Sequence, residues 1–312
     1  MKLPVPFLQL PLRFNAEALA AEVEALGEDV WRDHPQKFPG NSMLPLLAAG
    51  GDPANESFIG EMAPTPELIR CPSLLHAITS LRTVVGRTRL MRLAGQAEVS
   101  PHVDQGYYWT DRVRVHVPIV TQPTVRFHCG GATVHMAAGD CWIFDTWREH
   151  KVENDASDSR IHLVVDTVGG PGFWDLVEKG RAHDASTQGW VQHEIKVCAP
   201  PQHLLCERYN IPAVMSPWEV DFRLQGLLDE VDQGSPLTHT AREMSRKFFR
   251  IWRSLWVQYG DSGEGSDHYR DALFTFLGDI PMPVAQLQLH NGTRWMDGVL
   301  ALIGKMAVRQ QR

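Results

Sequence analysis

Between residues 87 and 168 the chain consists of short β-prone runs that follow one another closely, with no helical stretch between them. Such runs, rich in β-branched and aromatic residues and bounded by turn residues, are typical of strands. Two of them, 124–129 and 132–136, flank Gly130-Gly131, which is a two-residue hairpin signal. Closely spaced strands without intervening helices favour an antiparallel sandwich or a small barrel over a parallel sheet.

Helical patterns flank this β-rich segment. Asn15 and Gly27 bracket an amphipathic run as its N-cap and C-cap residues. A second helix is expected over residues 65–81, with Pro66 at its first position. Both helices precede the β-rich segment, so we predict a first domain over residues 1–174 that combines N-terminal helices with a β core.

After residue 174 the pattern becomes helical. Residues 216–219 have the form of a capping box and open a helix that is expected to end near Gly234. Further helices are expected over residues 236–259, 267–277 and 294–308. We therefore predict a helical C-terminal domain over residues 175–312, whose amphipathic helices bury one face.

Charge and cysteine content exclude several classes of protein. The formal net charge of the 312-residue chain is −7, which lacks the basic excess expected of a nucleic-acid-binding protein. No apolar run reaches the roughly 18 residues of a membrane span. The cysteines are odd in number, widely spread and without a CxxC motif, which argues against a disulfide framework or a zinc ribbon, indicates a reducing compartment and predicts a cytoplasmic protein. The five cysteines are Cys71, Cys129, Cys141, Cys198 and Cys206.

The segment that carries chemistry is Pro101-His102-Val103-Asp104, directly after an expected strand. Side chains at positions i and i+2 of an extended segment point the same way, so His102 and Asp104 can bind one ion together. His150 is the candidate for a third ligand from a distant strand. Two imidazoles and one carboxylate form the facial triad of non-haem Fe(II) oxygenases. A turn in which Asp104 caps the backbone is the alternative interpretation.

A second expected strand with charged residues on one face begins at Arg160, ten residues after His150. In the run 160–166 the apolar residues alternate with polar ones, so Arg160 and His162 share one face. A buried arginine opposite a metal can bind the distal carboxylate of a dicarboxylate co-substrate, because its planar guanidinium forms two parallel hydrogen bonds. The alternative is an edge strand on which Arg160 is solvated.

The run 112–117 shows the same alternation, with valines on one face and cations on the other. The cationic face consists of Arg112, Arg114 and His116. Three cations on one face repel each other unless an anion lies among them. The run is therefore either a half-exposed strand or part of an anion-binding wall.

In their order and spacing these motifs resemble the aspartyl/asparaginyl β-hydroxylase family. The motifs are PHxD, RVH, GDxWIFD, a distal histidine and RIHLVVD, within residues 87–168. Within the family, the motifs resemble those of the L-proline cis-4-hydroxylase branch. The resemblance implies a double-stranded β-helix, or jelly roll, and an enzyme that depends on Fe(II), 2-oxoglutarate and O2.

The resemblance also implies roles for individual residues. His102, Asp104 and His150 match the metal ligands, and Arg160 matches the arginine that pairs with the C5 carboxylate of 2-oxoglutarate. Arg114 and His116 match the Arg-x-His that lines the co-substrate pocket. Candidate substrate contacts are Arg92, Tyr108, Trp109, Trp147 and His162. The animal enzymes of the family have glycine where this chain has Asp104, so we do not transfer their substrate, an epidermal-growth-factor-like domain.

The expected reaction is hydroxylation of an unactivated C–H bond, with release of succinate and CO2. By family analogy the expected substrate is a free amino acid or a similar small carboxylate, with a peptide or a lipid-linked acyl chain as the alternative. Desaturation or ring closure would use the same triad. A non-redox β-sandwich that holds a structural metal is the alternative of another class. The long helix over 236–259 is compatible with a homodimer.

Overall fold

The computed structural model describes residues 1–35, 37–196 and 203–309. Its contacts divide the chain into two compact units. The β unit comprises Met1–Asp104 and Tyr108–Asn210, and the helical unit comprises Gln105–Tyr107 and Ile211–Arg312. The helical unit thus begins later than residue 175, because three short strands after that residue pair with strands of the β unit. These strands are β13 (Arg181–Ala182), β14 (His193–Glu194) and β15 (Leu205–Cys206).

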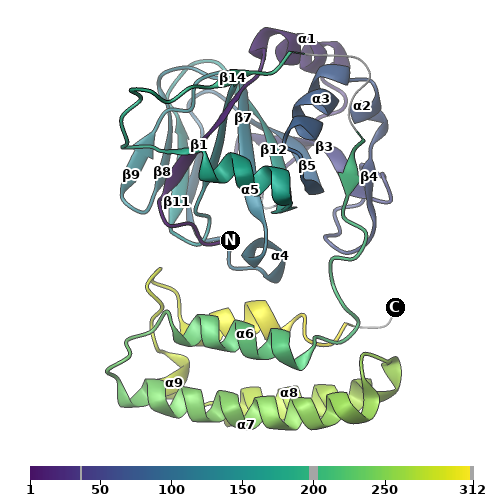
Figure 1. Ribbon diagram of the computed structural model, residues 1–312, viewed down its shortest axis with the longest axis vertical. Helices are drawn as coiled ribbons and strands as arrows, with labels where there is room; N and C mark the ends of the chain where they lie inside the picture. Colours follow the sequence, from purple (N-terminus) through teal and green to yellow (C-terminus); the bar gives the residue numbers. More distant parts are fainter. Residues whose placement is uncertain (36, 197–202, 310–312) are drawn as a thin grey trace. The chain divides into compact units, whose positions relative to one another are not determined.

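The β unit contains two mainly antiparallel sheets (Figure 1). The strand order of the large sheet is β13, β1 (Phe7–Arg13), β10 (Asp140–Phe144), β7 (Val113–Val120), β12 (Arg160–Gly169), β5 (Val84–Leu93), β3 (Asn41–Ala49) and β2 (Arg32–Asp33), with β4 (Met62–Pro64) beside β3. The order of the small sheet is β6 (Glu98–His102), β11 (His150–Asn154), β8 (Val125–Cys129) and β9 (Ala132–Val134). This sheet arrangement confirms the expected jelly roll.

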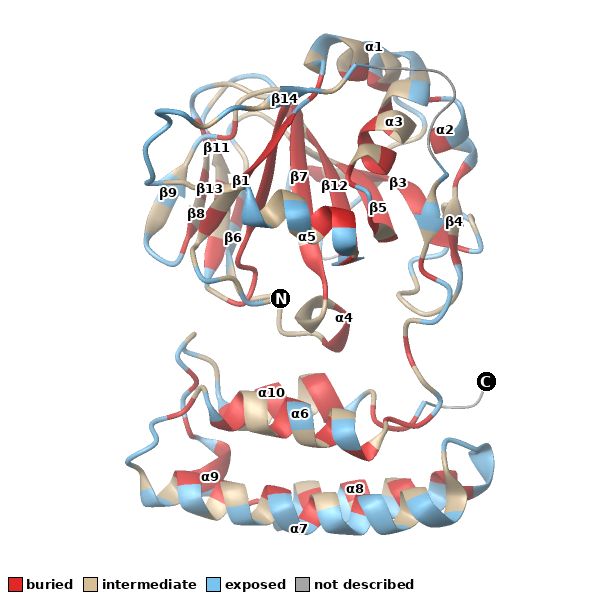
Figure 2. Cartoon of the chain, in the orientation of Figure 1, coloured by how far each residue is buried: buried red, intermediate tan, exposed pale blue. Residues whose placement is uncertain are grey.

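The large sheet is buried on both faces. One face packs against the helices α1 (Ala16–Leu26), α2 (Pro66–Ile69), α3 (Pro72–Ser80) and α5 (Pro171–Glu178) through a single apolar cluster. The other face meets the small sheet through a second cluster that includes Phe127, Phe144 and Val152. The red strands of Figure 2 show this burial. Side chains of alternate residues therefore point either to the helices or into the space between the sheets.

Several predicted elements are confirmed and others change. The N-cap Asn15 accepts a hydrogen bond from the backbone N–H of Ala18 at 3.0 Å, and the Gly130-Gly131 hairpin joins β8 to β9. The single helix expected over 65–81 is wrong: it is broken into α2 and α3. The break precedes Pro72, because a residue before proline is disfavoured in the helical conformation.

The helical unit is built from α6 (Pro217–Leu228), α7 (Pro236–Tyr259), α8 (Ser266–Asp279), α9 (Met282–Ala285) and α10 (Trp295–Val299), which a π-helical turn extends over 300–304. Ser216 caps α6 by accepting a hydrogen bond from the backbone N–H of Glu219 at 3.2 Å. The helix ends at Leu228, before the expected Gly234. Trp252, Phe248 and Phe276 form an aromatic core between α7 and α8.

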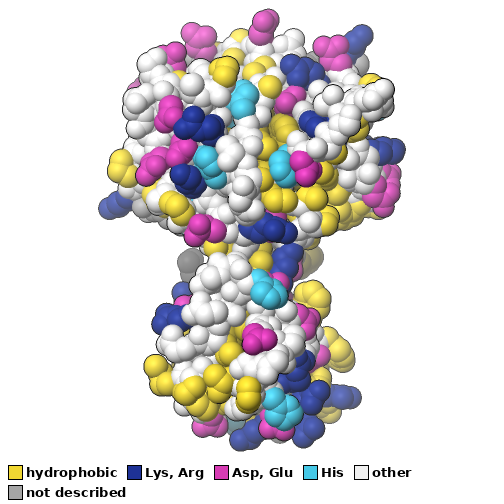
Figure 3. Space-filling model, turned by 90° about the vertical axis from the view of Figure 1, so that its left-hand side faces the viewer, with side chains coloured by type: hydrophobic (Ala, Val, Ile, Leu, Met, Phe, Trp, Pro, Cys, Tyr) yellow, Lys and Arg dark blue, Asp and Glu magenta, His cyan; other side chains and the backbone are white. Residues whose placement is uncertain are grey.

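The surface and the cysteines agree with an ordinary globular chain. On the face of the β unit seen in Figure 3, basic and acidic side chains are interspersed. The described cysteines, Cys71, Cys129, Cys141 and Cys206, are free, and Cys198 lies outside the described residues. Within the part of the chain that the structure describes, none of the helices combines the length and apolar character that a membrane crossing requires.

Candidate functional site

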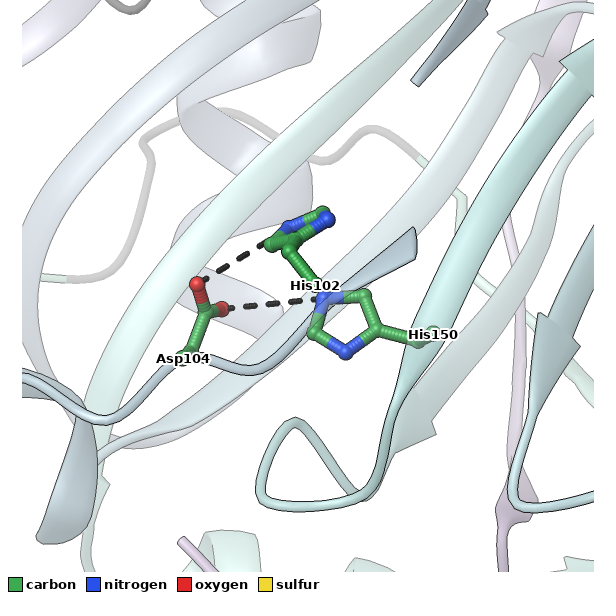
Figure 4. A group of neighbouring side chains, drawn as sticks. All are labelled: His102, Asp104 and His150. Carbon is green, nitrogen blue, oxygen red and sulfur yellow. Dashed lines mark ion pairs between the residues drawn. The ribbon is translucent and has the colours of Figure 1, made fainter. Parts of the chain in front are cut away.

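The structure brings His102, Asp104 and His150 together. Their potential ligand atoms all lie within 4.8 Å of one another (Figure 4). His102 on β6 and His150 on β11 are direct register partners in the small sheet, which explains how residues 48 positions apart come to face each other. Asp104 follows β6, with its two carboxylate oxygens 4.0 Å from His102 Nε2 and 3.9 Å from His150 Nε2.

Backbone carbonyls orient both imidazole rings. His102 Nδ1 lies 2.8 Å from the backbone carbonyl of Ser100, and His150 Nδ1 lies 2.9 Å from that of Arg148. A carbonyl only accepts, so each Nδ1 donates to it, and Nε2 is the ring nitrogen that each histidine can offer to a metal. Burial lowers the pKa of His150 to about 4, which keeps this imidazole neutral. The three side chains can hold a divalent metal ion.

Asp104 is kept ionised by its neighbours. Burial by itself raises the pKa of this carboxyl group, but the Arg114 guanidinium and the two histidines outweigh that effect and hold the pKa below its usual value. Arg114 Nη1 lies 2.9 Å from Asp104 Oδ2. The Nε–H of the same arginine donates to Asp166 Oδ1 at 3.2 Å. The carboxylate is thus available as a metal ligand at neutral pH.

These residues line a cavity of about 350 Å³ in the β unit. Its walls come from both sheets: β5, β7, β10 and β12 of the large sheet and β6, β8 and β11 of the small one. Aromatic and apolar side chains, including Phe127, Phe144 and Val164, cover most of the wall between the charged groups. The volume is in the range of small-molecule sites.

Arg160 is buried in this wall with 3% of its surface exposed. In the described part of the chain no carboxylate pairs with it; its Nη1–H donates a long hydrogen bond to the carbonyl of Met91 at 3.4 Å, and its Nε has no partner. Burial lowers its pKa to about 10, so it remains a cation at neutral pH. A buried cation without a counter-ion is costly. Its fork of donors fits the carboxylate of a bound dicarboxylate such as 2-oxoglutarate.

His116 and His162 form a buried pair beside Arg160. Their Nδ1 atoms lie 3.5 Å apart, and burial lowers both pKa values well below the usual value. His116 lines the cavity and its Nε2 has no partner, so it can contact a ligand there. His162 has no exposed surface and stacks on Phe127, behind the wall.

The remaining predicted contacts lie in different places. Trp109 lines the cavity, with the Arg114 guanidinium 4.2 Å above its ring. Tyr108, in the one-turn helix α4 (Tyr107–Thr110), is buried and accepts a hydrogen bond from the backbone N–H of Arg87 at 2.9 Å. Trp147 is buried with Lys2 5.1 Å from its ring centre. Neither Tyr108 nor Trp147 is among the residues that line the cavity.

Arg92 lies outside the cavity. Its Nη1–H donates to Glu28 at 2.7 Å, and its guanidinium lies 4.2 Å from the centre of the Trp31 ring. Alternation along β5 explains the difference, because Arg87, Arg89 and Met91 point into the cavity and Arg92 points to the opposite face.

The sequence analysis missed three charged residues of the site: Arg87, Arg89 and Asp166. The first two line the cavity, and Asp166 is fully buried between Arg89 and Arg114. The alternation of the run 87–91 could have revealed the two arginines. The cations Arg112 and Arg114 are neutralised by carboxylates of the chain itself. Asp166 and Asp104 pair with Arg114, and Glu207 pairs with Arg112.

The fold and the triad together define the class of a jelly-roll metalloenzyme. Residues 17–169 match the aspartyl/asparaginyl beta-hydroxylase family. Through this segment the chain belongs to that family and is an Fe(II)- and 2-oxoglutarate-dependent oxygenase, with O2 as the second substrate. Membership in an enzyme family overturns the alternative of a non-redox metal-binding module. A search of curated proteins finds no match.

Solved structures give weaker similarities. A prolyl-4-hydroxylase from Pseudomonas putida is 16% identical, with 53% of this chain and 92% of that one covered and a TM-score of 0.37. A 2OG-Fe(II) oxygenase family oxidoreductase from Burkholderia pseudomallei is 14% identical, with coverages of 47% and 77% and a TM-score of 0.35. A prolyl hydroxylase from Trichoplax adhaerens, solved with a hypoxia inducible factor peptide, is 12% identical, with coverages of 55% and 87% and a TM-score of 0.38.

Proposed function

We propose that the protein hydroxylates an unactivated C–H bond of an amino acid or an amino-acid-like small molecule. Fe(II), 2-oxoglutarate and O2 supply the oxidising chemistry, and succinate and CO2 are the co-products. The observation that carries this proposal is that Arg160, a buried cation with no carboxylate partner in the described part of the chain, shares one small cavity with His102, Asp104 and His150.

Different residues of the cavity bind the metal and the 2-oxoglutarate. His102, Asp104 and His150 hold the metal through two Nε2 atoms and one carboxylate oxygen. Arg160 orients 2-oxoglutarate by binding its C5 carboxylate, and His116 and Arg114 line the same pocket. Phe127 and Phe144 line the wall between these groups, and an apolar wall strengthens each of these electrostatic contacts.

Arg87 and Arg89 support a substrate that carries a carboxylate. Both are about 6% exposed and both line the cavity. Among the described residues Arg87 has no ion pair, and its guanidinium lies 4.2 Å from the centre of the Phe58 ring. Arg89 lies 3.9 Å from the carboxylate of Asp166, which also pairs with Arg114, and the Nε of Arg89 has no hydrogen-bond partner in the same part of the chain. We therefore expect Arg87 and Arg89, and not Arg92, to bind the carboxylate of the substrate.

The balance of charge points the same way. The cavity wall holds the cations Arg87, Arg89, Arg114 and Arg160. Three carboxylates oppose them: Asp104 and Glu56, which also line the cavity, and the adjoining Asp166. A divalent metal and the two carboxylates of 2-oxoglutarate add charges that cancel, so one cation remains uncompensated. Buried charges are stable only when they are paired. An anionic substrate would complete the pairing.

The test is 2-oxoglutarate turnover, measured as succinate release, with free amino acids, their amides, short peptides and acyl thioesters. We expect acceleration by an amino acid and not by its amide. Arg89→Gln should raise the KM for that amino acid about 10- to 100-fold, because a charge-assisted hydrogen bond is lost. Arg92→Gln, on the same strand but outside the cavity, is the matched control. Acceleration by peptides or thioesters alone would refute the proposed substrate class.

We also propose a cytoplasmic location. The described cysteines are free, and an enzyme of ferrous iron is compatible with a reducing compartment. The homodimer remains a prediction.

A further inference from the structure

Asp166 lies at the centre of the charged wall, and the reaction gives it no direct role. It is on β12, on the same face as Arg160 and Val164, and it has no exposed surface. Its register partner on β7 is Arg114, and Arg89 lies on the strand at the other side of β12. A carboxylate in this position faces two guanidinium groups from opposite sides.

The contacts of Asp166 lead directly to Asp104. Asp166 Oδ1 accepts a hydrogen bond from Arg114 Nε at 3.2 Å, and a carboxylate oxygen of Asp166 lies 3.9 Å from Arg89 Nη2. Arg114 Nη1 then lies 2.9 Å from Asp104 Oδ2. One guanidinium therefore bridges a fixed carboxylate, Asp166, and a carboxylate that belongs to the metal site, Asp104.

We propose that Asp166 is a positioning residue, which holds Arg114 so that Arg114 engages only one oxygen of Asp104 and leaves the other for the metal. This inference rests on the proposed function, in which Asp104 binds the metal. With Asp166 in place, the Nε–H of Arg114 is committed to Asp166 and its charge is shared between two carboxylates. The Asp104 carboxylate then keeps more of its negative charge for a cation.

Loss of the Asp166 charge has a definite consequence. In Asp166→Asn, Asp104 is the one close anionic partner left to Arg114 among the residues that the structure describes, so Arg114 binds that carboxylate more tightly and competes with the metal. Arg89 also loses its close anionic neighbour and repels Arg114. Outer-shell partners of metal ligands change metal affinity by about 10- to 100-fold, so we expect the Kd for a divalent metal to rise by about that factor.

The experiment is a double-mutant cycle on Mn(II) affinity, read from the electron paramagnetic resonance signal of free Mn(II). It compares the wild type, Asp166→Asn, Arg114→Gln and the double variant. We expect Asp166→Asn to weaken binding in the wild-type background and to have no further effect when Arg114 is already replaced. Asp140→Asn, which removes another buried carboxylate that pairs with an arginine, Arg13, at 2.7 Å, should bind Mn(II) as the wild type does.

The other outcomes distinguish a wrong role for Asp166 from a wrong proposed function. Equal affinity of the wild type and Asp166→Asn, or the same loss in both backgrounds, overturns the role of Asp166 and leaves the metal site intact. A wild type that binds no Mn(II) overturns the proposed function itself. If Asp166→Asn does not fold, Arg114→Lys carries the test: lysine keeps the charge but cannot bridge two carboxylates, so Mn(II) affinity should fall about 10-fold, and wild-type affinity would refute the bridge.

Discussion

Replacement of Arg160 by methionine should make the protein more stable and weaken its binding of 2-oxoglutarate. The pKa of Arg160 is lowered from 12.5 to about 10 by burial alone, and each pH unit corresponds to about 1.4 kcal/mol. Because the folded state disfavours the charged form, the guanidinium lowers the free energy of unfolding at pH 7 by about 3 kcal/mol. Methionine can pack beside Phe127, whose ring centre lies 5.5 Å from the guanidinium carbon of Arg160, and it removes this cost.

The assay is urea denaturation of the metal-loaded protein, without and with 2-oxoglutarate, under anaerobic conditions. Without 2-oxoglutarate, Arg160→Met should raise the free energy of unfolding by about 1 to 3 kcal/mol. A concentration of 100 times the Kd should stabilise the wild type by about 2.7 kcal/mol and the variant by much less. Arg126→Met, which removes an arginine of β8 outside the cavity, is the control. A destabilised Arg160→Met that still responds to 2-oxoglutarate would refute the reasoning.

Three further predictions concern stability and specificity. Burial lowers the pKa of His150 to about 4 in the folded state, so the metal-free protein should lose stability as the pH falls from about 6.5 toward 4; a flat unfolding free energy across this window would contradict this. Gly169→Ala should destabilise by about 1 to 3 kcal/mol in urea melts, because φ is +91° and a Cβ would lie 2.4 Å from the Trp174 ring; an unchanged midpoint would count against it. Arg92→Ala should leave the Kd for 2-oxoglutarate unchanged when it is measured by calorimetry. A tenfold rise of this Kd would show that Arg92 does belong to the binding site.

The sequence predicts the core of the fold because alternation is strong in the strands that form it. In β7 and β12 the apolar residues of one face, such as Val115 and Leu163, pack toward the helices, and the residues between them, such as Arg114 and Arg160, face the cavity, as the period of two requires. The strand β1 was not predicted, because Pro4, Pro6 and Pro11 obscure its pattern in the sequence. It forms because Phe7 and Leu10 pair with β10 and are buried in the two clusters.

The metal site could be predicted because its geometry is largely local. His102 and Asp104 are two residues apart, and only His150 requires the fold. The charged wall could not be predicted in the same way, since Asp166 and Arg114 meet only through the register of β12 against β7. The choice between Arg89 and Arg92 depends on which face of β5 turns inward, and a one-residue difference in that assignment moves the side chain to the other face.

The central claim is that one cavity holds the metal through His102, Asp104 and His150 and holds 2-oxoglutarate through Arg160. It is tested most directly by an anaerobic titration of Fe(II)-loaded protein with 2-oxoglutarate, monitored by the visible metal-to-ligand charge-transfer band. We predict a saturable band in the wild type that is lost in Asp104→Ala and weakened in Arg160→Ala. No band, in wild-type protein that still holds one metal ion per chain, would contradict the account.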